Sequence, residues 1–195
     1  MKDNEYFMYD FDGTIYDGDS SIDFWIYNIL KKPVLMIYTY KFFVKSILYF
    51  LHLVEKEELK QAFFYPIIKN KNLDKILNDF WNKNDSKIKK FFKNEKGNKI
   101  IISASPEFLI KPIAKKYKCY LIATKFNLET GEIIGKNCLG EEKVYRLKSY
   151  FRNKRFEILK FYSDSDKDMP LTRISQKSFK VKNETIKEWK VIKEK

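Results

Sequence analysis

The chain has few of the residues that dominate very small, fibrous or disordered proteins. Its 195 residues include only 6 Gly, 5 Pro and 2 Cys, which excludes a collagen-like chain, a low-complexity chain and a disulfide scaffold. Hydrophobic residues make up 44% of the chain and aromatic residues 17%, so disorder is excluded as well. A chain of this length can bury a core without cross-links, and Cys119 and Cys138 are expected to be free thiols in a reducing compartment.

Histidine and arginine are also scarce, and this restricts the chemistry. His52 is the only histidine and lies in an aromatic run, so carboxylates are better catalytic candidates than a Ser-His or Cys-His pair. The net charge of +13 makes nucleic acid, anionic membranes and phosphorylated substrates candidate partners. However, only 4 of the 39 basic residues are arginine, the side chain that nucleic-acid recognition favours. We therefore interpret most lysines as solvated surface charge, and a basic nucleic-acid-binding module is the non-enzymatic alternative.

A long uninterrupted apolar run is missing too. The most apolar stretch, residues 33–54, contains Lys41 and Lys45, each of which is costly at the centre of a bilayer. We predict an amphipathic helix that packs inside a helical lobe, with His52 packed there as well. Docking of this helix on a membrane surface is the alternative, and a transmembrane span is not expected. The polar N-terminus does not resemble a signal peptide, so we expect a cytoplasmic protein.

Short apolar runs alternate with helical patterns along most of the chain. Strands are predicted over residues 6–9, 99–102, 120–124, 157–162 and 178–181. Helices are predicted over residues 55–64, 73–81, 141–151 and 184–193, and an earlier helix begins near Asp19 or Ser20, either of which can cap it. Ser105 is predicted to cap the helix after the second strand, with Pro106 as its first residue. Residues 127–134 are predicted to form a hairpin.

This order of elements predicts an α/β fold in which a parallel sheet has helices on both faces. The pattern between about residue 20 and residue 94 is helical and contains no glycine, which indicates an all-helical insert after the first strand. Parallel sheets place ligand sites at the carboxyl ends of their strands. Because Asp10, Ser103 and Asp164 each follow closely on a predicted strand, we expect them at one edge of the sheet.

Four short motifs occur in a fixed order across nearly the whole chain. They are Asp10-Phe11-Asp12-Gly13-Thr14, then Ser103-Ala104-Ser105-Pro106, then Lys143, and finally Asp164 with Asp168. Together they resemble motifs I to IV of the haloacid dehalogenase (HAD) superfamily phosphatases, in the phosphoserine phosphatase-like subgroup (HAD-IB type). The resemblance implies a Rossmann-like core domain over residues 1–18 and 96–195. It also implies an inserted helical cap of the C1 type over residues 19–95.

The resemblance further implies a phosphomonoesterase that forms an aspartyl-phosphate. Asp10 would attack phosphorus, and Asp12 would protonate the leaving alkoxide and later accept a proton from water. Lys143 would supply fixed positive charge, and the hydroxyl of Ser103 would hold phosphoryl oxygens, so both are also substrate-binding candidates.

The same resemblance implies Mg²⁺ as the cofactor. Its ligands would be the carboxylates of Asp10 and Asp164 and the backbone carbonyl of Asp12, a set of hard oxygens suited to Mg²⁺. A cation is also needed on electrostatic grounds, because the carboxylates and the phosphoryl group would otherwise repel one another. Asp168 would orient Lys143 or a water ligand without binding the metal itself.

Several departures from the subgroup bear on the substrate. Asp19 stands where phosphoserine phosphatases place a glutamate that contacts the substrate ammonium group, so it is a substrate-binding candidate. Phosphoserine phosphatases bind the substrate carboxylate with an arginine of the cap, but no arginine precedes Arg146 in this chain. Lys60 or a neighbour would therefore have to bind such a carboxylate. Ser163 and Lys167 replace the Gly and Asn that are usual in motif IV.

These departures leave the chemistry intact but favour a substrate other than phosphoserine. We expect a small phosphorylated metabolite, and the alternative is a lipid phosphate hydrolysed at a membrane surface. A dehalogenase of the same superfamily is disfavoured, because it would need neither the acid Asp12 nor the metal-binding Asp164.

Overall fold

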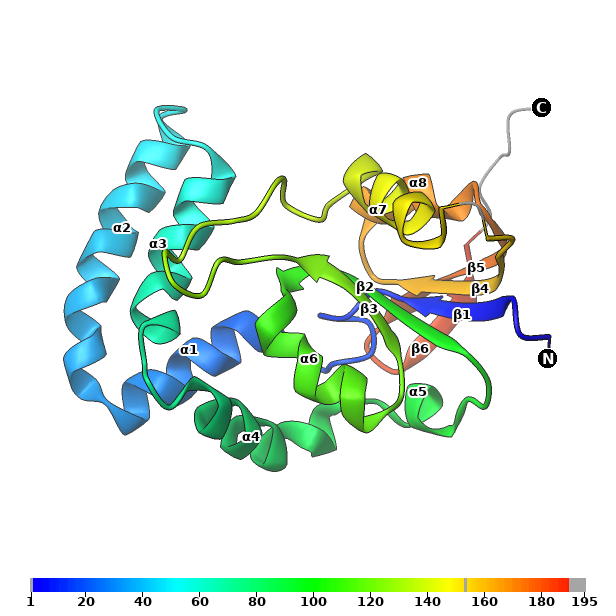
Figure 1. Ribbon diagram of the computed structural model, residues 1–195, viewed down its shortest axis with the longest axis horizontal. Helices are drawn as coiled ribbons and strands as arrows, with labels where there is room; N and C mark the ends of the chain where they lie inside the picture. The colour runs from blue at the N-terminus through cyan, green and yellow to red at the C-terminus, as the bar shows by residue number, and fades with distance from the viewer. Residues whose placement is uncertain (1, 153, 190–195) are drawn as a thin grey trace.

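The computed structural model describes residues 2–152 and 154–189. A six-stranded sheet lies at one end of the molecule, and a helical segment inserted between the first two strands extends to the other end (Figure 1). The strands are β1 (Glu5–Tyr9), β2 (Lys99–Pro106), β3 (Tyr120–Thr124), β4 (Glu157–Ser163), β5 (Ser175–Lys182) and β6 (Thr185–Glu188). The inserted helices are α1 (Ser20–Lys31), η1 (Pro33–Leu35), α2 (Met36–Phe50), α3 (Lys56–Ile68), α4 (Leu73–Asn84), η2 (Asp85–Lys87) and α5 (Lys90–Asn94). The remaining helices are α6 (Glu107–Lys116), α7 (Glu141–Phe151), η3 (Asp166–Asp168) and α8 (Met169–Thr172).

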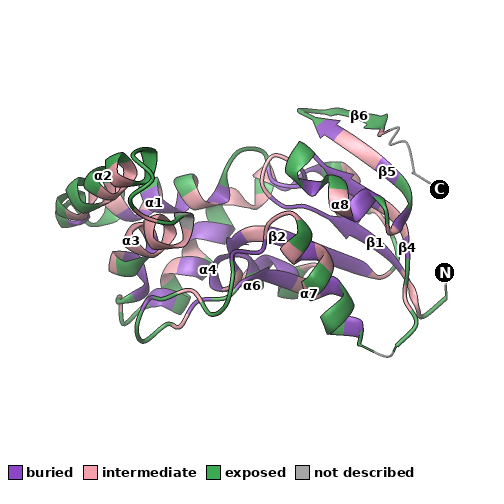
Figure 2. Cartoon of the chain, turned by 90° about the horizontal axis from the view of Figure 1, so that it is seen from above, coloured by how far each residue is buried: buried purple, intermediate pink, exposed green. Residues whose placement is uncertain are grey.

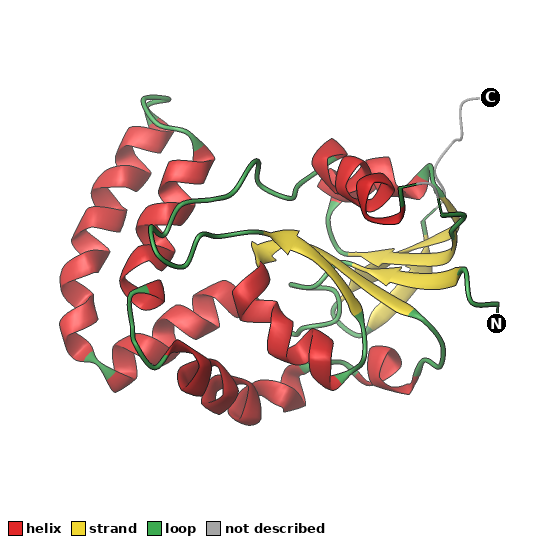
Figure 3. Cartoon of the chain, in the orientation of Figure 1, coloured by secondary structure: helices red, strands yellow, loops and turns green. Residues whose placement is uncertain are grey.

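The sheet has the order β3-β2-β1-β4-β5-β6, in which β1 to β5 are parallel and β6 is antiparallel. The order reverses at β1, because β2 lies on one side of it and β4 on the other. In open α/β sheets such a reversal leaves a crevice at the carboxyl ends of the strands, where ligands bind. Figure 3 shows these ends pointing toward the helical segment.

Successive residues of each central strand face opposite sides of the sheet, and each side is apolar. Tyr6 and Met8 of β1 pack in the cluster that α7 and α8 complete, whereas Phe7 and Tyr9 pack in the cluster that α6 completes. Both faces are therefore buried, as parallel strands require. The predicted α/β fold with helices on both faces is confirmed.

The helical segment is joined to the sheet domain by continuous packing. Trp81 of α4 donates a hydrogen bond from Nε1 to the carbonyl of Leu109 in α6 (2.7 Å). Phe11, which directly follows β1, makes an edge contact with the ring of Trp81 at 5.8 Å between centroids. Trp81 of the helical segment thus packs against Phe11 of the first motif.

The prediction of a helix over residues 184–193 is wrong for its described part. Residues 185–188 form β6, which pairs antiparallel with β5, and the amide of Trp189 donates to the carbonyl of Ser178 (2.7 Å). Asn183 adopts a left-handed conformation (φ 53°) that reverses the chain between the two strands. The open edge of β5 offers backbone partners that the local sequence pattern does not reveal. Residues 190–193 lie outside the described residues.

Two predictions at the other strand ends also need correction. Ser105 does not cap a helix, because β2 continues to Pro106 and α6 begins at Glu107 with Pro106 as the cap residue. Residues 127–134 do reverse the chain, with the amide of Asn127 donating to the carbonyl of Glu132 (2.8 Å). Only an isolated bridge flanks this turn, so it is a loop rather than a hairpin of two strands.

The apolar stretch of residues 33–54 forms a helix that packs against α3, as predicted, but it is less buried than a helix inside a lobe would be. It forms η1 and α2, yet no residue of α2 is buried. In Figure 2 this helix carries only the colours of exposed and intermediate residues. His52, expected to pack in the helical segment, is exposed. Among the described helices, none is both long enough and apolar enough to cross a bilayer.

Candidate active site

Asp10, Lys143 and Asp168 meet at the carboxyl end of β1. Asp10 is the first residue after the strand, and its amide donates to the carbonyl of Tyr162 in β4 (2.9 Å). The ammonium group of Lys143, in the first turn of α7, lies 2.7 Å from Oδ1 of Asp10 and 2.8 Å from the carboxylate of Asp168. Lys143 is only 1% exposed. One buried cation thus holds two carboxylates from motifs I and IV in fixed positions.

The charges of this cluster do not cancel. The pKa of the Asp10 carboxyl is raised to about 7, mainly because the group is buried. The positive charge of Lys143 opposes this rise, whereas the negative charges of Asp168 and Asp12 add to it. Burial alone would lower the pKa of Lys143, but Asp10 and Asp168 hold it above its usual range. Lys143 therefore stays charged, and the site carries excess negative charge that a further cation would neutralise.

Asp12 is held by the start of α1. Its Oδ1 accepts a hydrogen bond from the amide of Ser20 (2.6 Å), and its Oδ2 accepts one from the hydroxyl of Ser105 (2.5 Å). Ser105 Oγ in turn lies 3.2 Å from the hydroxyl of Ser21. Burial, followed by the charge of Asp19, raises the pKa of Asp12 to about 6, although both hydrogen bonds oppose the rise. A carboxyl with such a pKa can donate a proton and accept one near neutral pH.

Asp164 lies against the turn of motif I. Its amide donates to Oγ1 of Thr14 (2.9 Å), and that hydroxyl donates to Oδ1 of Asp164 (3.2 Å). Gly13 makes this approach possible, because a Cβ at that position would lie 2.3 Å from Oδ2 of Asp164. Gly13 also has φ +70°, which side chains rarely adopt. The carboxylate of motif IV therefore lies beside the backbone of motif I.

The residues that the family resemblance assigns to Mg²⁺ offer hard oxygen ligands and follow the adjacent strands β1 and β4. Within residues 2–152 and 154–189, no group of three or more His, Cys, Asp or Glu side chains could hold a metal ion. The predicted ligand set differs from such a group, because it contains the carboxylates of Asp10 and Asp164 and the backbone carbonyl of Asp12. The close approach of Asp164 to Gly13 and the uncompensated charge around Asp10 both fit a small divalent cation.

The remaining predicted residues lie at the same edge. Ser103 is 1% exposed, and its hydroxyl accepts a hydrogen bond from the amide of Ser105 (3.0 Å). Ser163 donates from its hydroxyl to Oδ2 of Asp168 (2.8 Å), so the serine that replaces the usual glycine is part of the buried network. Lys167, the other departure in motif IV, is exposed in η3.

The two residues considered for substrate recognition have different surroundings. Asp19 is exposed and caps α1, since its Oδ1 accepts hydrogen bonds from the amides of Ser21 and Ile22. Lys60 of α3 reaches across to the sheet domain, where its ammonium group donates to the carbonyl of Ala104 (2.7 Å) and to Oδ1 of Asn137 (2.8 Å). A lysine of the helical segment therefore contacts the residue next to Ser103.

Sequence reasoning missed several residues that position this cluster. They are Thr14, Ser20, Ser105, Asn137 and Ser163. Hydroxyl residues within or next to one of the four motifs were the available signal for Thr14, Ser105 and Ser163. Nothing in the local pattern points to Asn137, because its partners come from α3 and from the end of β3.

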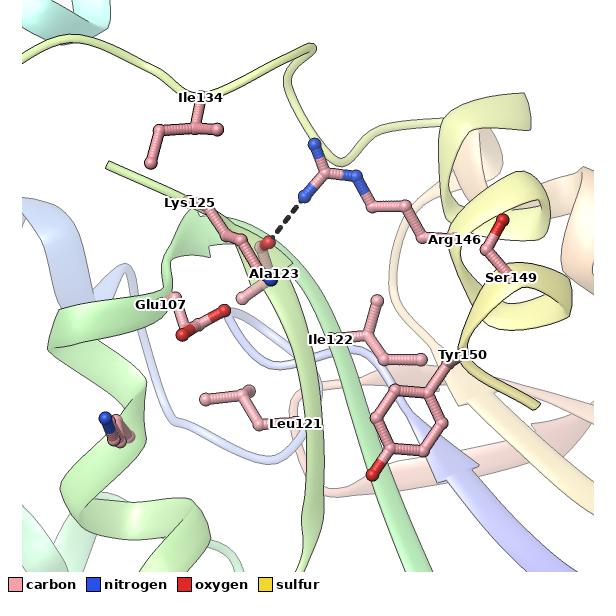
Figure 4. Close-up of a pocket in the computed structure, with 10 residues that line it drawn as sticks. Glu107, Leu121, Ile122, Ala123, Lys125, Ile134, Arg146, Ser149 and Tyr150 are labelled. Atoms are coloured by element: carbon pink, nitrogen blue, oxygen red, sulfur yellow. Dashed lines mark hydrogen bonds between the residues drawn. The ribbon is translucent and has the colours of Figure 1, made fainter. Parts of the chain in front are cut away.

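A separate cavity of about 490 Å³ lies along β3, at the free edge of the sheet between α6 and α7 (Figure 4). It is lined by Glu107, Lys111, Leu121, Ile122, Ala123, Lys125, Ile134, Arg146, Ser149 and Tyr150. None of the predicted catalytic residues lines it. Arg146 is engaged there by the carbonyl of Ala123 (2.7 Å) and the carboxylate of Glu142 (2.8 Å). The cavity is therefore not part of the candidate active site.

Comparisons with known proteins bear on the family and the fold of the chain. The model of the haloacid dehalogenase-like hydrolase family matches residues 7–173, and no curated protein matches the sequence. A protein of unknown function from Bordetella pertussis Tohama I has a similar structure, with 18% identity and a TM-score of 0.74 over 90% of this chain and 88% of that chain. A phosphoserine phosphohydrolase-like protein from Francisella tularensis has 15% identity and a TM-score of 0.54, over 89% and 85% of the two chains.

A phosphoserine phosphatase solved as a phospho-aspartyl intermediate analogue has 12% identity and a TM-score of 0.54, over 91% of this chain and 86% of that chain. At these identities the solved structures establish the fold, and the family model establishes the family. That model spans every motif from Asp10 to Asp168. The chain belongs to the haloacid dehalogenase-like hydrolase family.

Proposed function

We propose that the protein is a Mg²⁺-dependent phosphomonoesterase that acts through an aspartyl-phosphate on Asp10. The observation that carries the proposal is the arrangement at the carboxyl ends of β1 and β4. There Lys143 joins Asp10 to Asp168, Asp164 lies against the motif I turn, and Asp12 lies two residues from Asp10. Each of these groups has a role in transferring a phosphoryl group, and their roles differ.

In the first step a carboxylate oxygen of Asp10 attacks the phosphorus atom of the monoester. The bond from phosphorus to the ester oxygen breaks as the new bond forms, and Asp12 gives its proton to the departing alkoxide. A pKa of about 6 leaves part of the Asp12 population protonated near neutral pH, as this role requires. Lys143 holds Asp10 in place through their hydrogen bond of 2.7 Å.

In the second step water attacks the phosphorus of the aspartyl-phosphate. Asp12, now ionised, accepts a proton from that water, and the bond between phosphorus and Asp10 breaks. Inorganic phosphate leaves, and Asp10 is again a carboxylate. The hydrogen bonds from Ser20 and Ser105 to the two oxygens of Asp12 keep its carboxyl in one orientation through both steps.

Mg²⁺ would be held by Asp10, Asp164 and the carbonyl of Asp12, where it supplies positive charge to the phosphoryl oxygens. Ser103, buried in the second half of β2, would hold a phosphoryl oxygen through its hydroxyl. Asp168 contacts Lys143 rather than the predicted ligand set, so we assign it to the orientation of that lysine.

We also propose that residues 19–95 act as a cap over a core made of residues 1–18 and 96–195. The carboxyl ends of the strands point toward α1 to α3 (Figure 1), and Lys60 of α3 contacts the residue after Ser103. The substrate is then a small phosphorylated compound whose leaving group contacts the cap. Asp19 and Lys60 are the charged candidates for that contact, and a lipid phosphate is the second candidate substrate because α2 exposes an apolar face.

Hydrolysis of p-nitrophenyl phosphate tests the proposal. We expect turnover by the wild type with Mg²⁺, a loss of turnover with EDTA, and no turnover by Asp10→Asn. Asp17→Asn is the matched control, because Asp17 is exposed in the same turn and is expected to leave turnover unchanged. Metal-independent turnover, or full activity of Asp10→Asn, would refute the mechanism.

A further inference from the structure

One face of α2 exposes large apolar side chains along the whole helix. We call it the outer face; it consists of Met36, Ile37, Tyr40, Phe43, Val44, Ile47 and Phe50 of the helix, together with Leu51 directly after it. Their spacing of three and four residues places them on one side of the helix. Tyr40 is 71% exposed and Phe50 is 81% exposed. Contiguous apolar surface of this kind on a folded protein marks an interaction site.

The opposite side of α2 already has its partner in α3. The ring of Phe42 makes an edge contact with Phe63 (5.0 Å between centroids), and Lys45 forms an ion pair with Glu58 (2.6 Å). The helix is thus fixed to the molecule by its inner side. Its outer face is not needed for that packing and points away from α3.

No acidic residue occurs between residues 24 and 54, a stretch that contains four lysines. Two of the lysines near the outer face, Lys31 and Lys45, pair with Asp79 and Glu58 from other helices. Lys32 and Lys41 are exposed in the same stretch, and Lys41 lies over the ring of Tyr38 (5.7 Å). An anionic surface would meet no carboxylate in this stretch. A second copy of the chain would instead bring lysines against lysines, which disfavours self-association through this face.

We propose that the outer face of α2 docks on the surface of an anionic phospholipid bilayer, with the helix axis in the membrane plane. The helix has 15 residues and is therefore about 22 Å long. Its apolar side chains enter the boundary between headgroups and acyl chains, tyrosines such as Tyr40 remain at headgroup level, and lysines at the border contact lipid phosphates. This inference goes beyond the phosphatase proposal and does not depend on it.

Flotation of the full chain with vesicles tests the inference. We expect binding to vesicles of phosphatidylcholine mixed with phosphatidylglycerol, weaker binding to phosphatidylcholine alone, and a loss of binding as salt is raised. Tyr40→Glu is expected to weaken binding about tenfold or more, because it places a charge in the apolar face. Tyr145→Glu is the matched control: Tyr145 is a 66% exposed tyrosine on α7 of the sheet domain, and its replacement is expected to leave binding unchanged.

Two further measurements separate this inference from the enzymatic proposal and from self-association. Asp10→Asn is expected to bind vesicles like the wild type, and Tyr40→Glu to hydrolyse p-nitrophenyl phosphate like the wild type. The inference is overturned if the wild type fails to bind anionic vesicles, or if Tyr40→Glu binds them as well as the wild type. It is also overturned if sedimentation shows a dimer that Tyr40→Glu dissociates, since a second copy would then cover the face.

Discussion

Replacing Asp10 by Asn should stabilise the metal-free protein, although it removes the proposed nucleophile. Asp10 and Asp168 share the single ammonium group of Lys143, and the negative charge of Asp12 acts on Asp10 as well. An amide at position 10 can still accept the hydrogen bond from Lys143, whose charge then pairs with Asp168 alone. The substitution therefore removes a buried negative charge and keeps the packing.

The magnitude follows from the pKa of Asp10. A rise from 3.8 to about 7 corresponds to about 4 kcal/mol of unfavourable free energy when the carboxyl is fully ionised. The Asp10 side chain is 12% exposed, so partial hydration reduces this upper bound. We expect Asp10→Asn to raise the free energy of unfolding by about 2 kcal/mol at pH 8.

The stabilisation by Asp10→Asn should increase with pH. Below about pH 4 the Asp10 carboxyl is protonated in both the folded and the unfolded protein, so ionisation costs nothing. The cost grows between pH 4 and pH 7, because the unfolded chain releases the proton first, and it is complete above pH 7. The stability difference between Asp10→Asn and the wild type should therefore be largest at pH 8 and should shrink toward pH 5.

Urea denaturation in EDTA, followed by tryptophan fluorescence, measures this difference at each pH. Asp17→Asn serves again as the control, because it makes the same chemical change at an exposed position. Mg²⁺ should stabilise the wild type more than Asp10→Asn, since the ion binds only the folded site and the variant offers it a neutral amide in place of a carboxylate. If metal-free Asp10→Asn is less stable than the wild type at pH 8, the electrostatic account of the site is wrong.

Three further substitutions test the surroundings of the site. Ser105→Ala removes a hydrogen bond that favours ionised Asp12, so the acidic limb of the pH profile of kcat should move upward by about half a pH unit or more, whereas Ser105→Thr should restore it. Lys60→Met should raise KM about tenfold for a phosphomonoester carrying a second anionic group and leave KM for p-nitrophenyl phosphate unchanged; equal effects on both would exclude substrate recognition by Lys60. Ser163→Gly removes the hydrogen bond to buried Asp168 and should lower the free energy of unfolding by about 1 to 2 kcal/mol in urea titrations, and an unchanged value would contradict the role of that contact.

The sheet and the order of its elements could be predicted because strong local patterns specify them. The apolar run before Asp10 became β1, and the helix predicted over residues 141–151 is α7 with the same bounds. The end of the chain could not be predicted in this way. The local pattern of residues 184–193 favours a helix, but pairing with the open edge of β5 makes residues 185–188 a strand.

The packing of the helical segment could not be predicted from local sequence patterns either. The sequence correctly predicts a helix within residues 33–54, but which side of that helix packs against the protein depends on where α3 lies. Hydrophobic periodicity reports that a helix has an apolar side; it does not report whether that side meets the protein or its surroundings. The exposed outer face of α2 could be found only from the tertiary structure.

The amino-acid sequence by itself determined the chemical types and the chain order of the acidic, hydroxyl and amine groups, and with them the family. It could do so because motifs at strand ends are local features, and parallel strands bring such ends to one edge. The tertiary structure decided which of these groups touch: that Lys143 bridges Asp10 and Asp168, that Ser105 bonds to Asp12 instead of capping a helix, and that Ser163 joins the network. Lys143 lies 25 positions from Asp168 and 133 positions from Asp10 in the sequence. Only the packing of whole helices and strands against one another fixes the distance between residues so far apart.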